Sequence, residues 1–157
     1  MMNLVRRARP DRRLLAIMAI GAMAVVLGAC TPRPASAPSA TSTPGLVNEI
    51  NAQRAANGRG PLAIDAGLTD IASGWAAHLN AIGALQHQNL NAIPFWSALG
   101  ETVEVGSCGQ SDQAVVAAWM VSPSHHDVLL SAAFSAVGVA TTCGADGREW
   151  VVADFGG

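Results

Sequence analysis

A sharp change in composition near residue 44 constrains the fold of this chain more than any other feature. Five arginines lie within the first thirteen residues, and the uncharged run Leu14–Ala29 follows them. Thr31–Pro44 then contains four prolines and no large apolar residue, so this stretch cannot build a core. Only Gly45–Gly157 remains for a folded domain, and a domain of this length buries roughly two-thirds of its unfolded surface.

The N-terminal part is typical of an export signal. As a helix, Leu14–Ala29 would span roughly 24 Å, which is short of the ~30 Å hydrocarbon core of a bilayer. The small residues Leu27-Gly28-Ala29 run directly into Cys30, which resembles the bacterial lipoprotein processing site, where an acylated cysteine becomes the mature N-terminus. The alternative is ordinary cleavage after the small residues, with Cys30 unmodified. We predict a lipoprotein signal peptide over 1–29 and a lipidated Cys30, carrying for example palmitate, with an extended spacer over 30–44.

The charge of the remaining chain excludes one class of partner. Residues 30–157 carry 4 Arg against 10 Asp and Glu, a formal charge of −6. A domain this acidic lacks the positive surface that binds a phosphate backbone, so nucleic acid is excluded. The predicted partner is instead a membrane, reached through the lipid anchor, and the predicted location is the cell envelope outside the cytoplasm.

Hydrophobic spacing predicts helices in the first part of the domain. Apolar residues recur at steps of three and four after Asp65, a plausible cap, and before Gly83. The other helices are expected over 44–57, from the cap Ser111 to before Pro123, and from Pro123 through Leu130.

Strands are expected in the last part. Ala136–Cys143 and Glu149–Phe155 are rich in β-branched residues and flank the turn-forming Gly144–Gly147, which predicts an antiparallel hairpin. A further strand is expected around Glu101–Val105. Helices that precede strands indicate an α+β domain with about four helices packed on a small antiparallel sheet.

Two cysteines remain in the folded part. In a chain that leaves the cytoplasm, a single disulfide between Cys108 and Cys143 is the simplest interpretation. The alternative, a thiolate metal site, requires more cysteines at short spacing.

The tryptophans divide into two groups. Trp75, Trp119 and Trp150 fall on apolar faces and are expected in the core. Trp96 follows Pro94-Phe95 in a loop and is the aromatic candidate for lining a ligand cleft, with core packing as the alternative.

Motifs spread over almost the whole domain resemble the bacterial branch of the CAP superfamily, named for cysteine-rich secretory proteins, antigen 5 and pathogenesis-related 1 proteins. The motifs are Leu46-Val47-Asn48-Glu49-Ile50-Asn51-x-x-Arg54, Gly58-x-x-Pro61-Leu62, Leu68-x-x-x-Ala72, Leu85-x-His87, Gly100-Glu101, Trp119-Met120-Val121-Ser122-Pro123-Ser124-His125, Val137-Gly138-Val139 and Trp150-Val151-x-x-x-Phe155-Gly156.

The resemblance implies an α-β-α sandwich with a cleft that carries two histidines and acidic residues. Carried over by position, these residues are His87, Glu101 and His125, which should converge. The chain departs from the family at Ser122, a second cleft candidate along with Trp96, where eukaryotic members have a second glutamate, so the fourth cleft ligand is missing. Glu104 is a poor substitute, because residues three apart on a strand point to opposite faces.

Three interpretations of His87, Glu101 and His125 remain open. They can form a structural polar cluster, a metal site for zinc or calcium, or a catalytic centre. Two imidazoles and a carboxylate suffice for a zinc site, but no further acid or base is evident to handle the proton of an activated water.

The predicted function is therefore non-enzymatic binding of a lipid, an envelope component or a protein. The alternative is a metal-dependent extracytoplasmic hydrolase that acts on peptide or ester bonds.

Overall fold

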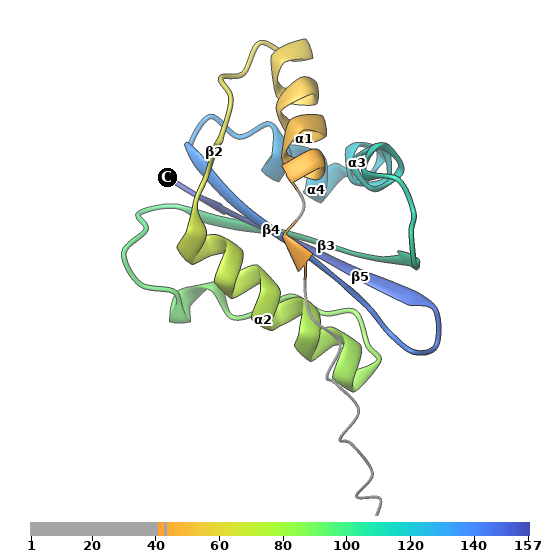
Figure 1. The fold of residues 1–157 in the computed structure, drawn as a ribbon. Helices are drawn as coiled ribbons and strands as arrows, with labels where there is room; N and C mark the ends of the chain where they lie inside the picture. The colour runs from red at the N-terminus through yellow and green to blue at the C-terminus, as the bar shows by residue number, and fades with distance from the viewer. Residues whose placement is uncertain (1–40, 43) are drawn as a thin grey trace, which may run out of the picture. The chain divides into compact units, whose positions relative to one another are not determined.

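A computed structural model describes residues 41–42 and 44–157 of the chain (Figure 1). The predicted signal peptide, Cys30 and the predicted spacer as far as Ala40 lie outside the described residues. Within residues 41–42 and 44–157, no helix is long and apolar enough to cross a membrane.

The predicted helices are confirmed. The described helices are α1 (Pro44–Ala56), α2 (Ala66–Ile82), the 3₁₀ turn η1 (Leu90–Ala92), α3 (Asp112–Val121) and α4 (Pro123–Leu129). The ends of α2 follow directly from its sequence. The Asp65 carboxylate accepts a hydrogen bond from the backbone N–H of Leu68 at 2.8 Å, and Gly83 ends the helix with a φ of 65° that favours glycine.

One mixed sheet contains the strands that the structure describes: β1 (Thr41–Ser42), β2 (Ala63–Ile64), β3 (Leu99–Ser107), β4 (Ala136–Cys143) and β5 (Arg148–Gly156). The strand order is β1-β4-β5-β3, with β5 antiparallel to both of its neighbours. The predicted hairpin is therefore β4–β5, and the predicted strand around Glu101–Val105 is the longer β3.

The two shortest strands were not predicted. Thr41–Ser42 belongs to the predicted spacer, yet it pairs antiparallel with Thr141 and Ala140 of β4. Ala63–Ile64 pairs parallel with Ala136–Val137 of the same strand. Both use the backbone groups along the outer edge of β4, and such pairing requires no particular side-chain pattern.

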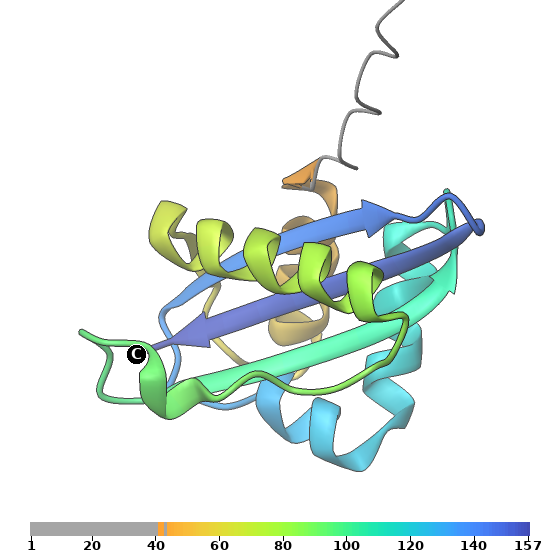
Figure 2. The same cartoon turned by 90° about the horizontal axis from the view of Figure 1, so that it is seen from below.

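Helices cover both faces of the sheet, which confirms the predicted α+β class and the sandwich (Figures 1 and 2). α2 packs on one face, where it meets Ala140, Trp150 and Val152. α1, α3 and α4 lie on the opposite face. The buried side chains on that side are Leu46, Val47, Ile50, Leu62, Val115, Val116, Trp119, Leu129, Val137, Val139, Val151, Ala153 and Phe155.

The predicted core tryptophans are only partly confirmed. Trp119 and Trp150 are buried, whereas Trp75 is half-buried at the rim of the α2 layer, where its ring stacks on His78 with centroids 4.6 Å apart. The predicted disulfide between Cys108 and Cys143 is present, with Cα atoms 5.6 Å apart.

Candidate functional site

The loop between α2 and β3 carries His87 alongside β3, which is the edge strand at the end of the order β1-β4-β5-β3. At its start, the indole N–H of Trp75 donates to the carbonyl oxygen of Gln86 at 3.1 Å. At its end, the backbone N–H groups of Ser97 and Ala98 donate to the carbonyl oxygen of Gly157 at 3.1 and 3.0 Å. The loop is thus fastened to α2 and to the end of β5, and His87 lies between these two attachments.

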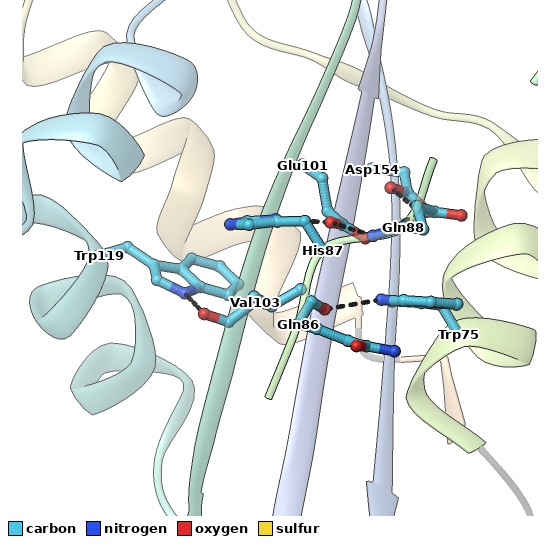
Figure 3. Close-up of polar contacts among 8 residues, drawn as sticks. All are labelled: Trp75, Gln86, His87, Gln88, Glu101, Val103, Trp119 and Asp154. Carbon is cyan, nitrogen blue, oxygen red and sulfur yellow. Dashed lines mark hydrogen bonds and ion pairs between the residues drawn. The ribbon is translucent and has the colours of Figure 1, made fainter. Parts of the chain in front are cut away.

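His87 and Gln88 both bind the carboxylate of Glu101 on β3 (Figure 3). The Nδ1 atom of His87 donates to Oε1 at 2.6 Å, and the backbone N–H of Gln88 donates to the same oxygen at 3.1 Å. The side-chain amide of Gln88 donates to Oε2 at 2.9 Å. The Glu101 side chain is only 1% exposed, whereas that of His87 is 56% exposed.

Asp154 is a fourth member of this cluster and was not predicted from the sequence. It lies directly opposite Glu101 in the register of β3 and β5, and Gln88 bridges the two carboxylates with a second hydrogen bond of 2.7 Å to Asp154 Oδ1. Burial raises the pKa of Asp154 to about 7, helped by the nearby Glu101 and opposed by the bond from Gln88. Its Oδ2 is buried and has no hydrogen-bond partner among the described residues.

A signal for Asp154 is present in the sequence. It is the single charged residue in the apolar run from Trp150 to Phe155, and a lone acid in a buried strand requires a partner. The identity of that partner depends on the strand order, because Glu101 lies opposite only once β3 pairs with β5.

His125 approaches the cluster from α4. The rings of His125 and His87 lie 6.0 Å apart between centroids at 64°, in an edge-on arrangement. Burial, and secondarily His87, lower the pKa of His125. The buried Arg54 fixes the end of α4, because its guanidinium donates to the carbonyl oxygens of Leu129 and Ser131 at 2.7 and 2.9 Å.

The three predicted site residues therefore lie close together, as the resemblance implied, but Glu101 does not stand free beside the imidazoles. Its oxygens accept three hydrogen bonds from His87 and Gln88. Across residues 41–42 and 44–157, no group of three or more His, Cys, Asp or Glu side chains is placed to hold a metal ion. The assignment of His87, Glu101 and His125 as metal ligands stays a prediction.

Among the described residues, no hydrogen bond joins His126, Glu104 or Ser122 to this cluster. His126 is half-buried, and its Nδ1 lies 3.4 Å from a carboxylate oxygen of Asp127. Glu104 pairs with Val151, which places it on the opposite face of the sheet from Glu101, as predicted. Burial, and secondarily Glu149, raise its pKa. Ser122 joins α3 to α4 and makes no side-chain capping bond.

Beyond His87, the same loop borders a pocket of about 640 Å³. Trp96, one of the two predicted cleft residues, lines it, whereas Ser122 does not. The Trp96 ring rests on Gly156, where any Cβ would collide with it.

A family model described as "CAP: Cysteine-rich secretory protein family" matches residues 47–155. The chain therefore belongs to the CAP family, and the fold and the ordered motifs agree with that membership. A search of curated proteins found no match.

Three solved structures share the fold. An outer surface protein from Borrelia burgdorferi is 23% identical, with a TM-score of 0.63, over 71% of this chain and 88% of that one. An extracellular protein of Bacillus anthracis strain Ames that contains an SCP domain is 19% identical, with a TM-score of 0.57, over 71% and 38%. A cysteine-rich secretory protein of Staphylococcus aureus is 20% identical, with a TM-score of 0.54, over 70% and 36%. The chain thus spans well under half of the last two proteins.

Proposed function

We propose that this chain is an exported CAP-domain lipoprotein that acts as a non-enzymatic binding module outside the cytoplasmic membrane. The basic leader, the apolar run and Cys30 support export and lipid attachment. The similar structures described as outer surface, extracellular and secretory proteins support the same location. The ligand belongs to one of three classes: a lipid, an envelope component or another protein.

The observation that supports a binding role is that both carboxylate oxygens of Glu101 are buried and already hydrogen-bonded within the protein. A catalytic carboxylate must come within hydrogen-bond reach of the substrate, directly or through one water. Glu101 is almost fully buried and holds His87 and Gln88 in place with both of its oxygens. The cluster therefore acts as a support that fixes the loop, and the surface offered to a ligand consists of the exposed imidazole of His87 and the loop beyond it.

The same geometry supports a weak zinc site rather than a calcium site. With Nδ1 of His87 donating to Glu101, the other ring nitrogen remains available, and a carboxylate that orients a histidine ligand from behind is a common arrangement in zinc proteins. His125 would supply a second nitrogen. Calcium prefers six to eight oxygen ligands, and two imidazoles do not meet that preference.

The hydrolase alternative has no observation in its favour. Asp154 is the one acid near Glu101 whose pKa is raised to about 7, but its bonded oxygen contacts Gln88 within the buried cluster. It is fully buried, so it cannot exchange a proton with a substrate at the surface.

The proposal is tested by calorimetric titration of zinc and of calcium into the full chain in detergent, together with turnover assays on peptide and ester libraries. We expect zinc to bind more tightly than calcium, with the zinc signal lost in His87→Ala and His125→Ala. His126→Ala, the neighbouring histidine on α4, is the matched control and should retain it. Turnover that is abolished in both site variants and kept in His126→Ala would contradict the binding role. Native mass spectrometry of protein purified from membranes then identifies the ligand class.

A further inference from the structure

We infer that the pocket beside Trp96 binds a neutral saccharide, such as a glycan segment of the cell envelope. This inference rests on the proposed function and narrows the ligand to one chemical class. We call this cavity the loop pocket. Its polar lining consists of Gln88, Asn89, Asn91 and Ser97.

The size and the charge of the loop pocket define what fits. Its volume of about 640 Å³ falls within the ~300–1,000 Å³ typical of small-molecule sites and accommodates a ligand of disaccharide size. None of its lining residues is ionisable. A phosphate or carboxylate group would therefore find no cation to pair with, although such pairs are the strong contacts in anion sites. The lining favours a neutral ligand.

Side-chain amides dominate the polar lining. An amide presents both an acceptor oxygen and two donor hydrogens, which matches the hydroxyl groups of a sugar, each of them donor and acceptor at once. Gln88 uses its amide nitrogen on Glu101 and Asp154 and so forms a fixed wall. Asn89 and Asn91 are exposed, and the Asn89 side chain accepts one bond, from the backbone N–H of Asn91 at 3.2 Å. Both amides thus keep donors for a ligand.

Trp96 supplies a flat apolar wall. The ring lies against Gly156, which lacks a side chain, and this contact sets the plane of the indole. A sugar ring has one apolar face of C–H groups, and an aromatic ring suits that face while the hydroxyl rim meets the amides. The loop pocket combines both kinds of wall.

Phe95 gives independent support from the backbone. Its φ of 77° lies in the left-handed region, which non-glycine residues seldom adopt, and its residue surface is 99% exposed. The strained backbone of such a residue costs stability, and an aromatic ring that packs against nothing in the described part of the chain gains no contact that offsets this cost. Phe95 does not itself line the loop pocket, but it directly precedes Trp96 in the chain, and a ligand that extends past Trp96 would meet it.

The direct test is a titration of the full chain with triacetylchitotriose and with maltotriose, in a detergent without a sugar headgroup. Tryptophan fluorescence and calorimetry report the binding. Trp96→Ala should weaken binding about tenfold or more, and Asn91→Ala about three- to tenfold. Asn48→Ala replaces an exposed asparagine on α1 and should leave the affinity unchanged. Because Trp96→Ala removes a packed ring, Trp96→Phe is the fallback and should retain most of the affinity.

A second variant separates ligand binding from structure. Phe95→Gly removes the strain and should raise the melting temperature while weakening saccharide binding by about threefold or more. A purely structural Phe95 would not produce these opposite changes.

Three outcomes overturn the inference: neither saccharide binds, the affinity is unchanged in both Trp96→Ala and Asn91→Ala, or glucose 6-phosphate binds more tightly than the neutral probes. In each of these cases, a lipid or protein ligand found on the purified chain would still support the proposed binding function. Turnover that depends on His87 and His125 would instead contradict the proposed non-enzymatic function.

Discussion

The two faces of the sheet are built on different principles. The face toward α1, α3 and α4 buries a continuous apolar cluster in which Trp119 and Phe155 are the largest side chains. The face toward α2 begins in the same way, around Trp150 and Val152, but ends in the buried carboxylates of Glu101 and Asp154. The first face stabilises the domain through apolar burial. At the end of the second face, burying two carboxylates lowers the stability, but their hydrogen bonds fix a loop.

This difference bears on where the proposed binding surface lies. Two carboxylates in adjacent positions on neighbouring strands disfavour each other's ionisation, and burial increases that effect. They are tolerated because Gln88 donates to both and because His87 donates to Glu101. The polar end of the α2 face therefore fixes His87 and Gln88 of the loop that also lines the loop pocket.

The largest expected effect tests the apolar face. Trp119→Ala removes a fully buried ring and should lower the free energy of unfolding by about 3–5 kcal/mol. Val121→Ala, at an 83% exposed position on the same helix, should change it by about 0.5 kcal/mol or less. Urea denaturation measures both variants. Similar losses in the two would mean that this face is not the dominant core.

The second test addresses the polar end through pH. Asp154 has a pKa of about 7 in the folded chain and an ordinary value of 3.8 when unfolded, so the folded state binds the extra proton between these values. The stability that this proton supplies is complete below pH 3.8 and is lost as the pH rises through about 7. Asp154→Asn stays neutral. Its stability relative to the parent should therefore increase from about pH 4 to 7, by at most about 4 kcal/mol, and stay constant above that range.

Denaturation of both proteins at pH 4, 6 and 8 measures this difference. A gap between variant and parent that is the same at all three pH values would show that Asp154 does not carry the raised pKa.

A third test uses a pair of variants and sharpens the contrast within the α2 face. A Cβ at Gly138 would collide with the backbone of Leu68 and Thr69, where α2 rests on β4, so Gly138→Ala should destabilise the domain by about 3 kcal/mol. A Cβ at Gly74, in the exposed part of α2, meets nothing within 4 Å. Gly74→Ala should therefore stabilise it by about 0.5–1 kcal/mol. Thermal melts distinguish the two, and equal signs would refute the close packing of α2 at Gly138.

Much of the fold could be predicted because its signals are local. Asp65 and Gly83 define α2 through their own capping chemistry, and the β4–β5 hairpin follows from two β-branched runs around a turn. Strands β1 and β2 could not be predicted, since two-residue pairings depend on an edge of β4 that exists only after folding.

The site divides in the same way. The convergence of His87, Glu101 and His125 was expected from the family resemblance. A structural polar cluster was one of the three interpretations left open for these residues. The participation of Gln88 and Asp154 was not predicted, because it depends on the register that sets β3 against β5 and on the path of the loop. The spacing of residues along the chain does not reveal the register of β3 against β5 or the path of the loop.

Glu101 orients His87 by accepting a hydrogen bond from its Nδ1, and the rest of the site depends on this contact. Long-range ¹H–¹⁵N NMR of the imidazole rings at about pH 8, with His87→Ala to assign the signals, tests it most directly. We expect a proton on Nδ1 of His87 and an unprotonated Nε2, with this preference lost in Glu101→Gln. A His87 ring that carries its proton on Nε2 in the parent protein, or a tautomer unchanged in Glu101→Gln, would contradict the account.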